Sequence, residues 1–177
     1  DALTDGWERE HCYTGVFREN VQAKNDPSYP SKYLKADQPL YPCTDVQARY
    51  KNPCYRRQPM YALLMQNNDF AKVFDLCAKV EVDFRPACYH GLGRSAFFQS
   101  IEEQVTDIAQ AGSTRMLCML GEDHEAQSNC VAGAVKTFIY YNRGDTRVEA
   151  FCRPFDADLH AVCHRAAEEY YEDFALD

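Results

Sequence analysis

The chain lacks the long apolar runs and the basic character that would place it in a membrane or on a nucleic acid. No stretch approaches the roughly 18 apolar residues that a membrane-spanning helix needs. Its 19 lysines and arginines are outnumbered by 27 aspartates and glutamates, which gives a net charge of −8. Clustered cations bind phosphate backbones and anionic lipid surfaces, so this balance disfavours both as partners.

The sequence also lacks the short motifs of common catalytic and metal-binding families. It has neither the C-x₂₋₄-C spacing of zinc sites nor the C-x-x-C-H of haem attachment. It contains no nucleophile elbow, His-Glu-x-x-His helix or dinucleotide-binding glycine fingerprint. No segment alternates apolar and polar residues convincingly enough for a β sheet. We therefore expect an all-α protein without a cofactor.

Nine cysteines are present, and eight of them fall into closely spaced pairs. On one straight helix eleven residues span about 16 Å, whereas a disulfide needs Cα atoms within about 7 Å. If each pair is bonded internally, the chain must fold back between its two members, as a helical hairpin does. Alternatively, both cysteines share one helix face and bond to other helices. The expected disulfides are Cys43–Cys54, Cys77–Cys88, Cys118–Cys130 and Cys152–Cys163.

These four expected bonds indicate the compartment. Each closes a loop of about a dozen residues, worth roughly 3 kcal/mol in the chain-entropy model. Because a cytosolic protein rarely keeps such bonds oxidised, the cysteines predict an extracytoplasmic protein: periplasmic, cell-surface or secreted.

The cysteine spacing also repeats along the chain. Cys12 and the second members of the four pairs are separated by 42, 34, 42 and 33 residues in turn. Short and long intervals alternate, so the period is a double unit, 76 residues from Cys12 to Cys88 and 75 from Cys77 to Cys152. Three positions after these cysteines the residue is small in four of five cases, which predicts buried helix–helix contacts at Gly15, Gly91, Gly133 and Ala166.

We therefore predict one domain over 1–177, built as an α-solenoid-like repeat of tandem helical hairpins stapled by disulfides. Helices are expected near 7–22, 44–51, 54–67, 69–79, 84–99, 101–111, 114–120, 124–141, 146–153 and 157–173. Residues 24–42, rich in proline and tyrosine, are expected to form a long ordered connection across the helices. Its Tyr29, Tyr33 and Tyr41 are candidate binding residues, with packing alone as the alternative.

Several segments resemble one protein family. Cys12-Tyr13-Thr14-Gly15-Val16-Phe17-Arg18-Glu19-Asn20 is similar to a motif in cysteine-rich helical-repeat proteins of bacterial envelopes, where a cysteine is followed by Gly-Val-Phe-Met-Glu-Asn; Arg18 replaces the methionine. Further similar blocks are Pro30-Ser31-Lys32-Tyr33-Leu34, Pro39-Leu40-Tyr41-Pro42-Cys43 and Cys88-Tyr89-His90-Gly91-Leu92-Gly93-Arg94. The resemblance implies a compartment and a repeat design, and it implies no activity.

Two clusters are candidates for binding. Tyr89, His90 and Arg94 lie beside two glycines, which indicates either close helix packing or a ligand site. His160 and His164 are one helical turn apart, which makes them weak candidates for a metal face; a solvated surface is the alternative.

Cys12 is the unpaired cysteine. Because Tyr13 follows it and Gly15 lies three positions on, it has the marks of a second cysteine whose partner lies just before residue 1. We therefore expect the chain to be a fragment of a longer repeat protein. If Cys12 is instead a free thiol, the neighbouring His11 makes it a candidate nucleophile.

From these features we expect a non-enzymatic binding or structural module that binds a protein partner or itself. One such role is that of an accessory subunit in a larger assembly. The alternative is an extracytoplasmic enzyme, or a ligand or metal carrier, that uses the His90 region or the His160/His164 face. No catalytic residue is predicted.

Overall fold

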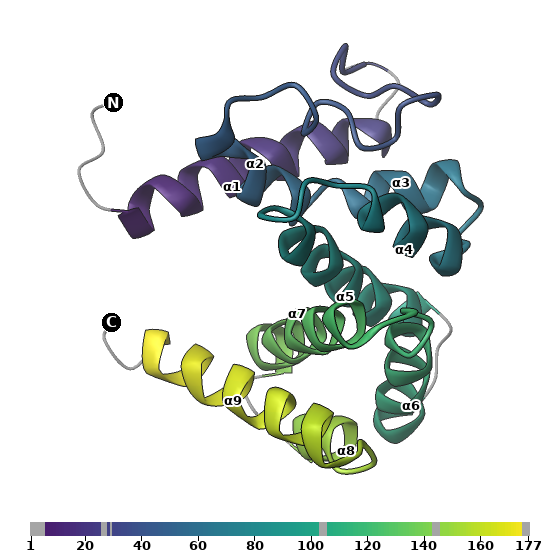
Figure 1. Ribbon diagram of the computed structural model, residues 1–177, viewed down its shortest axis with the longest axis vertical. Helices are drawn as coiled ribbons and strands as arrows, with labels where there is room; N and C mark the ends of the chain where they lie inside the picture. The colour runs from purple at the N-terminus through teal and green to yellow at the C-terminus, as the bar shows by residue number, and fades with distance from the viewer. Residues whose placement is uncertain (1–5, 26–27, 29, 103–105, 143–145, 175–177) are drawn as a thin grey trace. The chain divides into compact units, whose positions relative to one another are not determined.

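The computed structural model describes residues 6–25, 28, 30–102, 106–142 and 146–174 (Figure 1). Over these residues the chain forms nine α-helices and one short 3₁₀ helix, with no strand, so the all-helical prediction is confirmed for them. The elements are α1 (Gly6–Gln22), η1 (Ala23–Asn25), α2 (Ala48–Tyr55), α3 (Pro59–Met65), α4 (Phe70–Ala78), α5 (Arg85–Glu102), α6 (Asp107–Cys118), α7 (His124–Asn142), α8 (Thr146–Cys152) and α9 (Ala157–Phe174).

The chain divides into two compact units, Asp1–Gly91 and Leu92–Asp177. The boundary falls inside α5, so the first part of this helix belongs to one unit and the second part to the other. We describe each unit by itself, and the continuous solenoid over 1–177 therefore stays a prediction.

In the first unit α1 packs against α2, and α3 against α4. Residues 30–47 are non-helical and consist mainly of successive turns, closed by backbone bonds such as Gln38 N–H to Lys35 O (3.2 Å) and Tyr41 N–H to Gln38 O (2.9 Å). The Ser31 hydroxyl bonds the Asn20 side-chain oxygen, which attaches the connection to α1.

In the second unit α7 packs against α9, and α6 against α8. Its core contains a series of aromatic rings: Phe97 and Phe138 meet edge to face at 4.9 Å, and Phe138 and Phe151 lie 5.2 Å apart. All three rings are fully buried. Aromatic pairs at such distances add to the apolar burial that stabilises a helical core.

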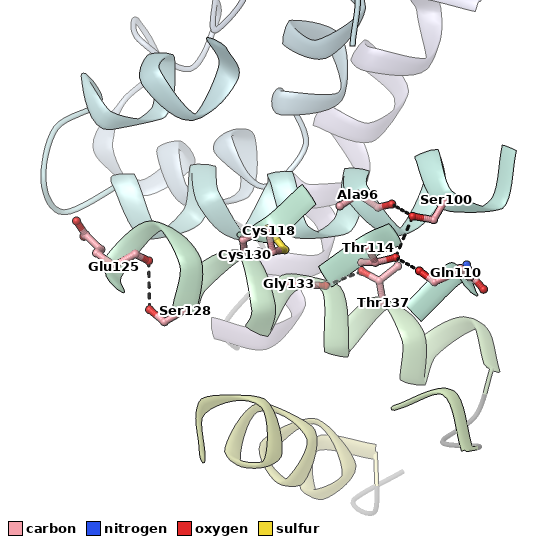
Figure 2. Close-up of a disulfide and its surroundings, with 10 residues drawn as sticks. All are labelled: Ala96, Ser100, Gln110, Thr114, Cys118, Glu125, Ser128, Cys130, Gly133 and Thr137. Atoms are coloured by element: carbon pink, nitrogen blue, oxygen red, sulfur yellow. Dashed lines mark hydrogen bonds between the residues drawn. A yellow bond between two sulfur atoms is a disulfide. The ribbon is translucent and has the colours of Figure 1, made fainter. Parts of the chain in front are cut away.

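A buried polar contact joins α5 and α6 in the same unit (Figure 2). The Thr114 hydroxyl lies 3.0 Å from Ser100 Oγ and 2.9 Å from the Gln110 carbonyl, and Ser100 donates to the Ala96 carbonyl. These hydroxyls can enter the core because each has a partner there.

Two predicted helix boundaries are wrong. The expected break between 111 and 114 is absent, because α6 begins after its N-cap Thr106, whose hydroxyl accepts the Ala109 N–H, and runs on to Cys118. The expected break at Asn52-Pro53 is also absent, since Pro53 lies inside α2. The break falls later, and Pro59 occupies the first turn of α3, where a proline's missing N–H has no helical partner to lose.

The structure contains four disulfides, with the pairing Cys43–Cys54, Cys77–Cys88, Cys118–Cys130 and Cys152–Cys163. Their Cα–Cα distances lie between 5.4 and 5.7 Å, which the chain achieves by folding back as expected from the spacing. Three bonds join consecutive helices. The first differs, because Cys43 lies in the non-helical connection and is bonded to α2.

The predicted small-residue contacts are buried at Gly91, Gly133 and Ala166. The prediction is wrong for Gly15, which is half-buried and has nothing within 4 Å of the position that a Cβ would take.

Candidate functional site

The first unit contains an open pocket of about 470 Å³ that is lined in part by the end of the proline-rich connection. One wall is formed by residues 37–41 and Thr44, and the other by Leu76 of α4 and the following residues 79–81, with Tyr55 at the end of α2. We call this the connection pocket. Its volume lies in the range of small-ligand sites.

Two interactions fix the part of the connection that lines the pocket. The fully buried Gln58 side chain donates from Nε2 to the Pro39 carbonyl at 3.0 Å. The Cys43–Cys54 disulfide bonds the same segment to α2. The pocket is therefore shaped before a ligand arrives, which reduces the entropy cost of binding.

The inner surface of the connection pocket is mainly apolar. Leu40, Tyr55 and Val80 are each less than a tenth exposed, and Leu76 is half-buried. The Tyr41 ring is covered by Lys35, whose Nζ lies 3.6 Å from the ring centroid. Such a surface fits an apolar or aromatic group, with the polar atoms around it setting orientation.

The charged edge of the pocket is organised by one ion pair. Lys51 Nζ lies 2.6 and 2.7 Å from the two carboxylate oxygens of Glu81, and 5.3 Å from the Phe84 ring centroid. The Lys51 side chain is 11% exposed and that of Glu81 is 58% exposed. This pair compensates a nearly buried cation and keeps Glu81 at the mouth of the pocket.

The phenol of Tyr55 stays protonated in this setting. Burial, and then the negative charges of Glu81 and Asp45, raise the pKa of Tyr55 to about 12. Nearby, burial and then the charge of Asp37 raise the pKa of Tyr61. The phenol therefore stays neutral well into the alkaline range, and at neutral pH it is a poor general base.

Of the tyrosines predicted from the connection, one lines the pocket. Tyr41 is part of its wall, whereas Tyr33 is 47% exposed, away from the lining, with Lys32 Nζ 5.0 Å from its ring centroid. Tyr29 lies outside the described residues.

The glycines next to Tyr89, His90 and Arg94 are explained by close packing. A Cβ on Gly91 would lie 2.7 Å from the Tyr55 carbonyl oxygen, and one on Gly93 would collide with the carbonyl of Cys130. Of the three candidates themselves, Tyr89 is buried with its ring 5.8 Å from that of Phe74, and His90 is half-buried. The Arg94 guanidinium lies 4.6 Å from the Phe98 ring centroid.

The two remaining candidates are on α9 and α1. His160 and His164 are half-buried with Nε2 atoms 3.1 Å apart. No group of three or more potential metal ligands occurs among the residues that the structure describes. Cys12 is exposed and has no disulfide, beside the exposed His11.

Sequence reasoning missed most of the connection pocket. Lys51 and Glu81 are 30 positions apart and Gln58 is 19 positions from Pro39, so no local pattern connects them. The only local signal was the cluster of prolines and tyrosines that contains Tyr41.

Four disulfides are typical of an oxidising, extracytoplasmic environment. Over the described ranges, no helix combines the length and the apolarity required for a membrane span. Comparisons with protein-family models, curated proteins and solved structures find no match to this chain.

Proposed function

We propose that this chain is a non-enzymatic binding module of the periplasm, the cell surface or the secreted space, and that a protein partner inserts an apolar or aromatic side chain into the connection pocket. The observation that carries the proposal is the pocket itself, an apolar cavity of about 470 Å³ whose wall is held by the Gln58–Pro39 hydrogen bond and the Cys43–Cys54 disulfide. Apolar anchors in such pre-shaped pockets dominate the affinity of protein interfaces.

The chemistry of the lining supports binding over catalysis. Its ionisable side chains include the carboxylates of Asp37 and Glu81, and the buried Tyr55, whose phenol is protonated at neutral pH. The lining contains neither histidine nor cysteine, the usual general base and the readiest nucleophile. The second hypothesis remains an extracytoplasmic enzyme, or a ligand or metal carrier, that uses the His90 region or the His160/His164 face.

The proposed partner presents a basic or neutral surface. The chain carries a net charge of −8, and association with another strongly acidic surface would be opposed by like-charge repulsion. An accessory subunit in a larger assembly is the setting that we favour for such a contact.

Photo-crosslinking in an envelope or secretion extract of the source organism tests this function. A photo-crosslinking amino acid replaces Lys79, which lines the pocket and is exposed. The matched control carries the same group at Lys72, which lies on α4, is exposed and is not part of the lining. We expect one protein to crosslink from position 79 and not from position 72.

A pocket-filling substitution completes the test. Leu76→Trp places a larger side chain in the cavity and is expected to abolish the crosslink from position 79, whereas Val82→Trp, at a 65% exposed position outside the lining, is expected to leave it intact. Circular dichroism confirms that both variants fold. Equal crosslinking from the two lysine positions, or a crosslink that survives Leu76→Trp, contradicts the proposal.

A further inference from the structure

The two histidines of α9 bring their Nε2 atoms close together. His160 and His164 are four residues apart, with Nε2 atoms 3.1 Å apart, ring centroids 4.3 Å apart and ring planes inclined by 45°. Residues four apart on a helix share a face, so both rings can extend over one turn of α9.

The backbone beneath this pair is held firmly. Leu159, Cys163 and Ala166 of α9 are each no more than 5% exposed, and Cys163 is bonded to Cys152 of α8. The same helix packs along α7. Because α9 is fixed on its buried side, the two half-buried imidazoles on its flank need little ordering before they act together.

The distance between the two nitrogens suits a shared metal ion. In the metal-free protein, two neutral imidazoles can lie at this distance when the N–H of one ring donates to the lone pair of the other. A divalent transition ion would be bound by both lone pairs, with metal–nitrogen distances of about 2.0–2.1 Å. At a nitrogen separation of 3.1 Å, such distances correspond to a nitrogen–metal–nitrogen angle of roughly 100°. That angle lies between the 90° of square-planar and the 109° of tetrahedral coordination, about equally far from either.

We propose that His160 and His164 form a two-histidine clamp for a divalent transition-metal ion, with Cu²⁺ bound more tightly than Ni²⁺ or Zn²⁺. Imidazole is a suitable ligand for all three ions, and Cu²⁺ stands highest in the order of affinities for a given site. The protein donates two ligands here, since no third histidine, cysteine or carboxylate joins them in the described part of the chain. Water or a ligand from another molecule completes the coordination, so the ion is exchangeable.

Two of the acidic residues near the pair make other contacts. Asp156 Oδ1 accepts the Leu159 N–H at 3.0 Å as the N-cap of the helix, and Glu169 Oε2 lies 3.8 Å from Lys136 Nζ. The clamp is independent of the connection pocket, which lies in the other unit.

Copper titration of the purified protein tests the clamp. The titrations use a Cys12→Ser background, because the exposed thiol of Cys12 would otherwise compete for copper. In that background we expect one Cu²⁺ per chain, with an electron paramagnetic resonance spectrum that shows two coordinated nitrogens. His160→Ala and His164→Ala should each weaken binding by at least about tenfold and remove one nitrogen from the spectrum.

The matched control is His124→Ala, which removes an exposed histidine at the start of α7 and should leave both the affinity and the spectrum unchanged. Circular dichroism of each variant shows that α9 remains helical. The proposal is overturned if no saturable Cu²⁺ binding occurs, if either α9 variant binds as tightly as its parent, or if His124→Ala loses binding to the same extent.

Discussion

The helical glycines differ in the space available at the position that a methyl group would occupy. At Gly91 a Cβ would lie 2.7 Å from the Tyr55 carbonyl oxygen and 2.9 Å from Pro59 Cγ. At Gly15 and Gly112 nothing lies within 4 Å of it. The first site requires the absence of a side chain, whereas the other two tolerate one.

Gly91→Ala should therefore destabilise the protein, by about 1–3 kcal/mol, because a rigid backbone carbonyl cannot move aside cheaply. Gly15→Ala, also within a helix of the first unit, should be neutral or stabilising by up to about 1 kcal/mol, since alanine favours the helix more than glycine does. Urea unfolding of both variants measures the difference. Equal stability of the two proteins would contradict the close contact at Gly91.

The buried Tyr55 should titrate at a higher pH than a tyrosine in the unfolded chain. Its pKa of about 12 lies above the value of about 10 expected in the unfolded chain, so its stabilising contribution is complete below pH 10 and is lost as the pH rises through 12. This difference between the folded and unfolded pKa corresponds to at most roughly 2–3 kcal/mol in the free energy of unfolding. The difference between the tyrosinate absorbance of the native protein and that of Tyr55→Phe should rise near pH 12. A difference signal that rises near pH 10 would show that Tyr55 is accessible to solvent.

At the scale of the elements, each disulfide closes a short change of chain direction. The Cys118–Cys130 bond joins the last residue of α6 to α7, with both residues fully buried (Figure 2). Asp123 supports the same turn as an N-cap, accepting the Ala126 N–H at 2.8 Å. Covalent and capping contributions therefore stabilise the same change of chain direction.

Replacing both Cys118 and Cys130 with alanine should lower the free energy of unfolding by about 3 kcal/mol, the cost of releasing a loop whose ends are 12 residues apart. Denaturant unfolding under non-reducing conditions measures this loss. The control is Cys12→Ala, at an exposed cysteine without a disulfide, which should stay within about 0.5 kcal/mol of the native protein. Similar stabilities for the two variants would mean that the bond adds little to the folded state.

At the scale of the whole molecule, the packing in the second unit supports the repeat proposal. There α7 packs against α9 and α6 against α8, so helices two apart along the chain lie together, as in stacked hairpins. The first unit differs from this arrangement at its first disulfide. Cys43 follows a series of turns, whereas Cys118, the corresponding cysteine of a pair in the second unit, is the last residue of helix α6. The turns before Cys43 form part of the lining of the connection pocket.

The sequence was most informative where the spacing of cysteines along the chain decides the structure. Eleven or twelve residues separate the members of each disulfide, so spacing alone could predict that the chain folds back there. The breaks at Asn52-Pro53 and between 111 and 114 were mispredicted, because a proline within a helix can be tolerated and Gly112 lies inside α6 with open space around it. Tyr41 was the one pocket residue that sequence reasoning selected.

The sequence by itself determined the helical class and indicated the disulfide framework and an oxidising compartment, because periodicity, capping and cysteine spacing act over about a dozen residues of chain or fewer. Only the tertiary structure decided the connection pocket and the geometry of the histidine pair. The pocket depends on Lys51 reaching Glu81 and Gln58 reaching Pro39, across 30 and 19 positions of chain. The 3.1 Å distance between the histidine nitrogens depends on side-chain orientations, which helical spacing permits but does not select.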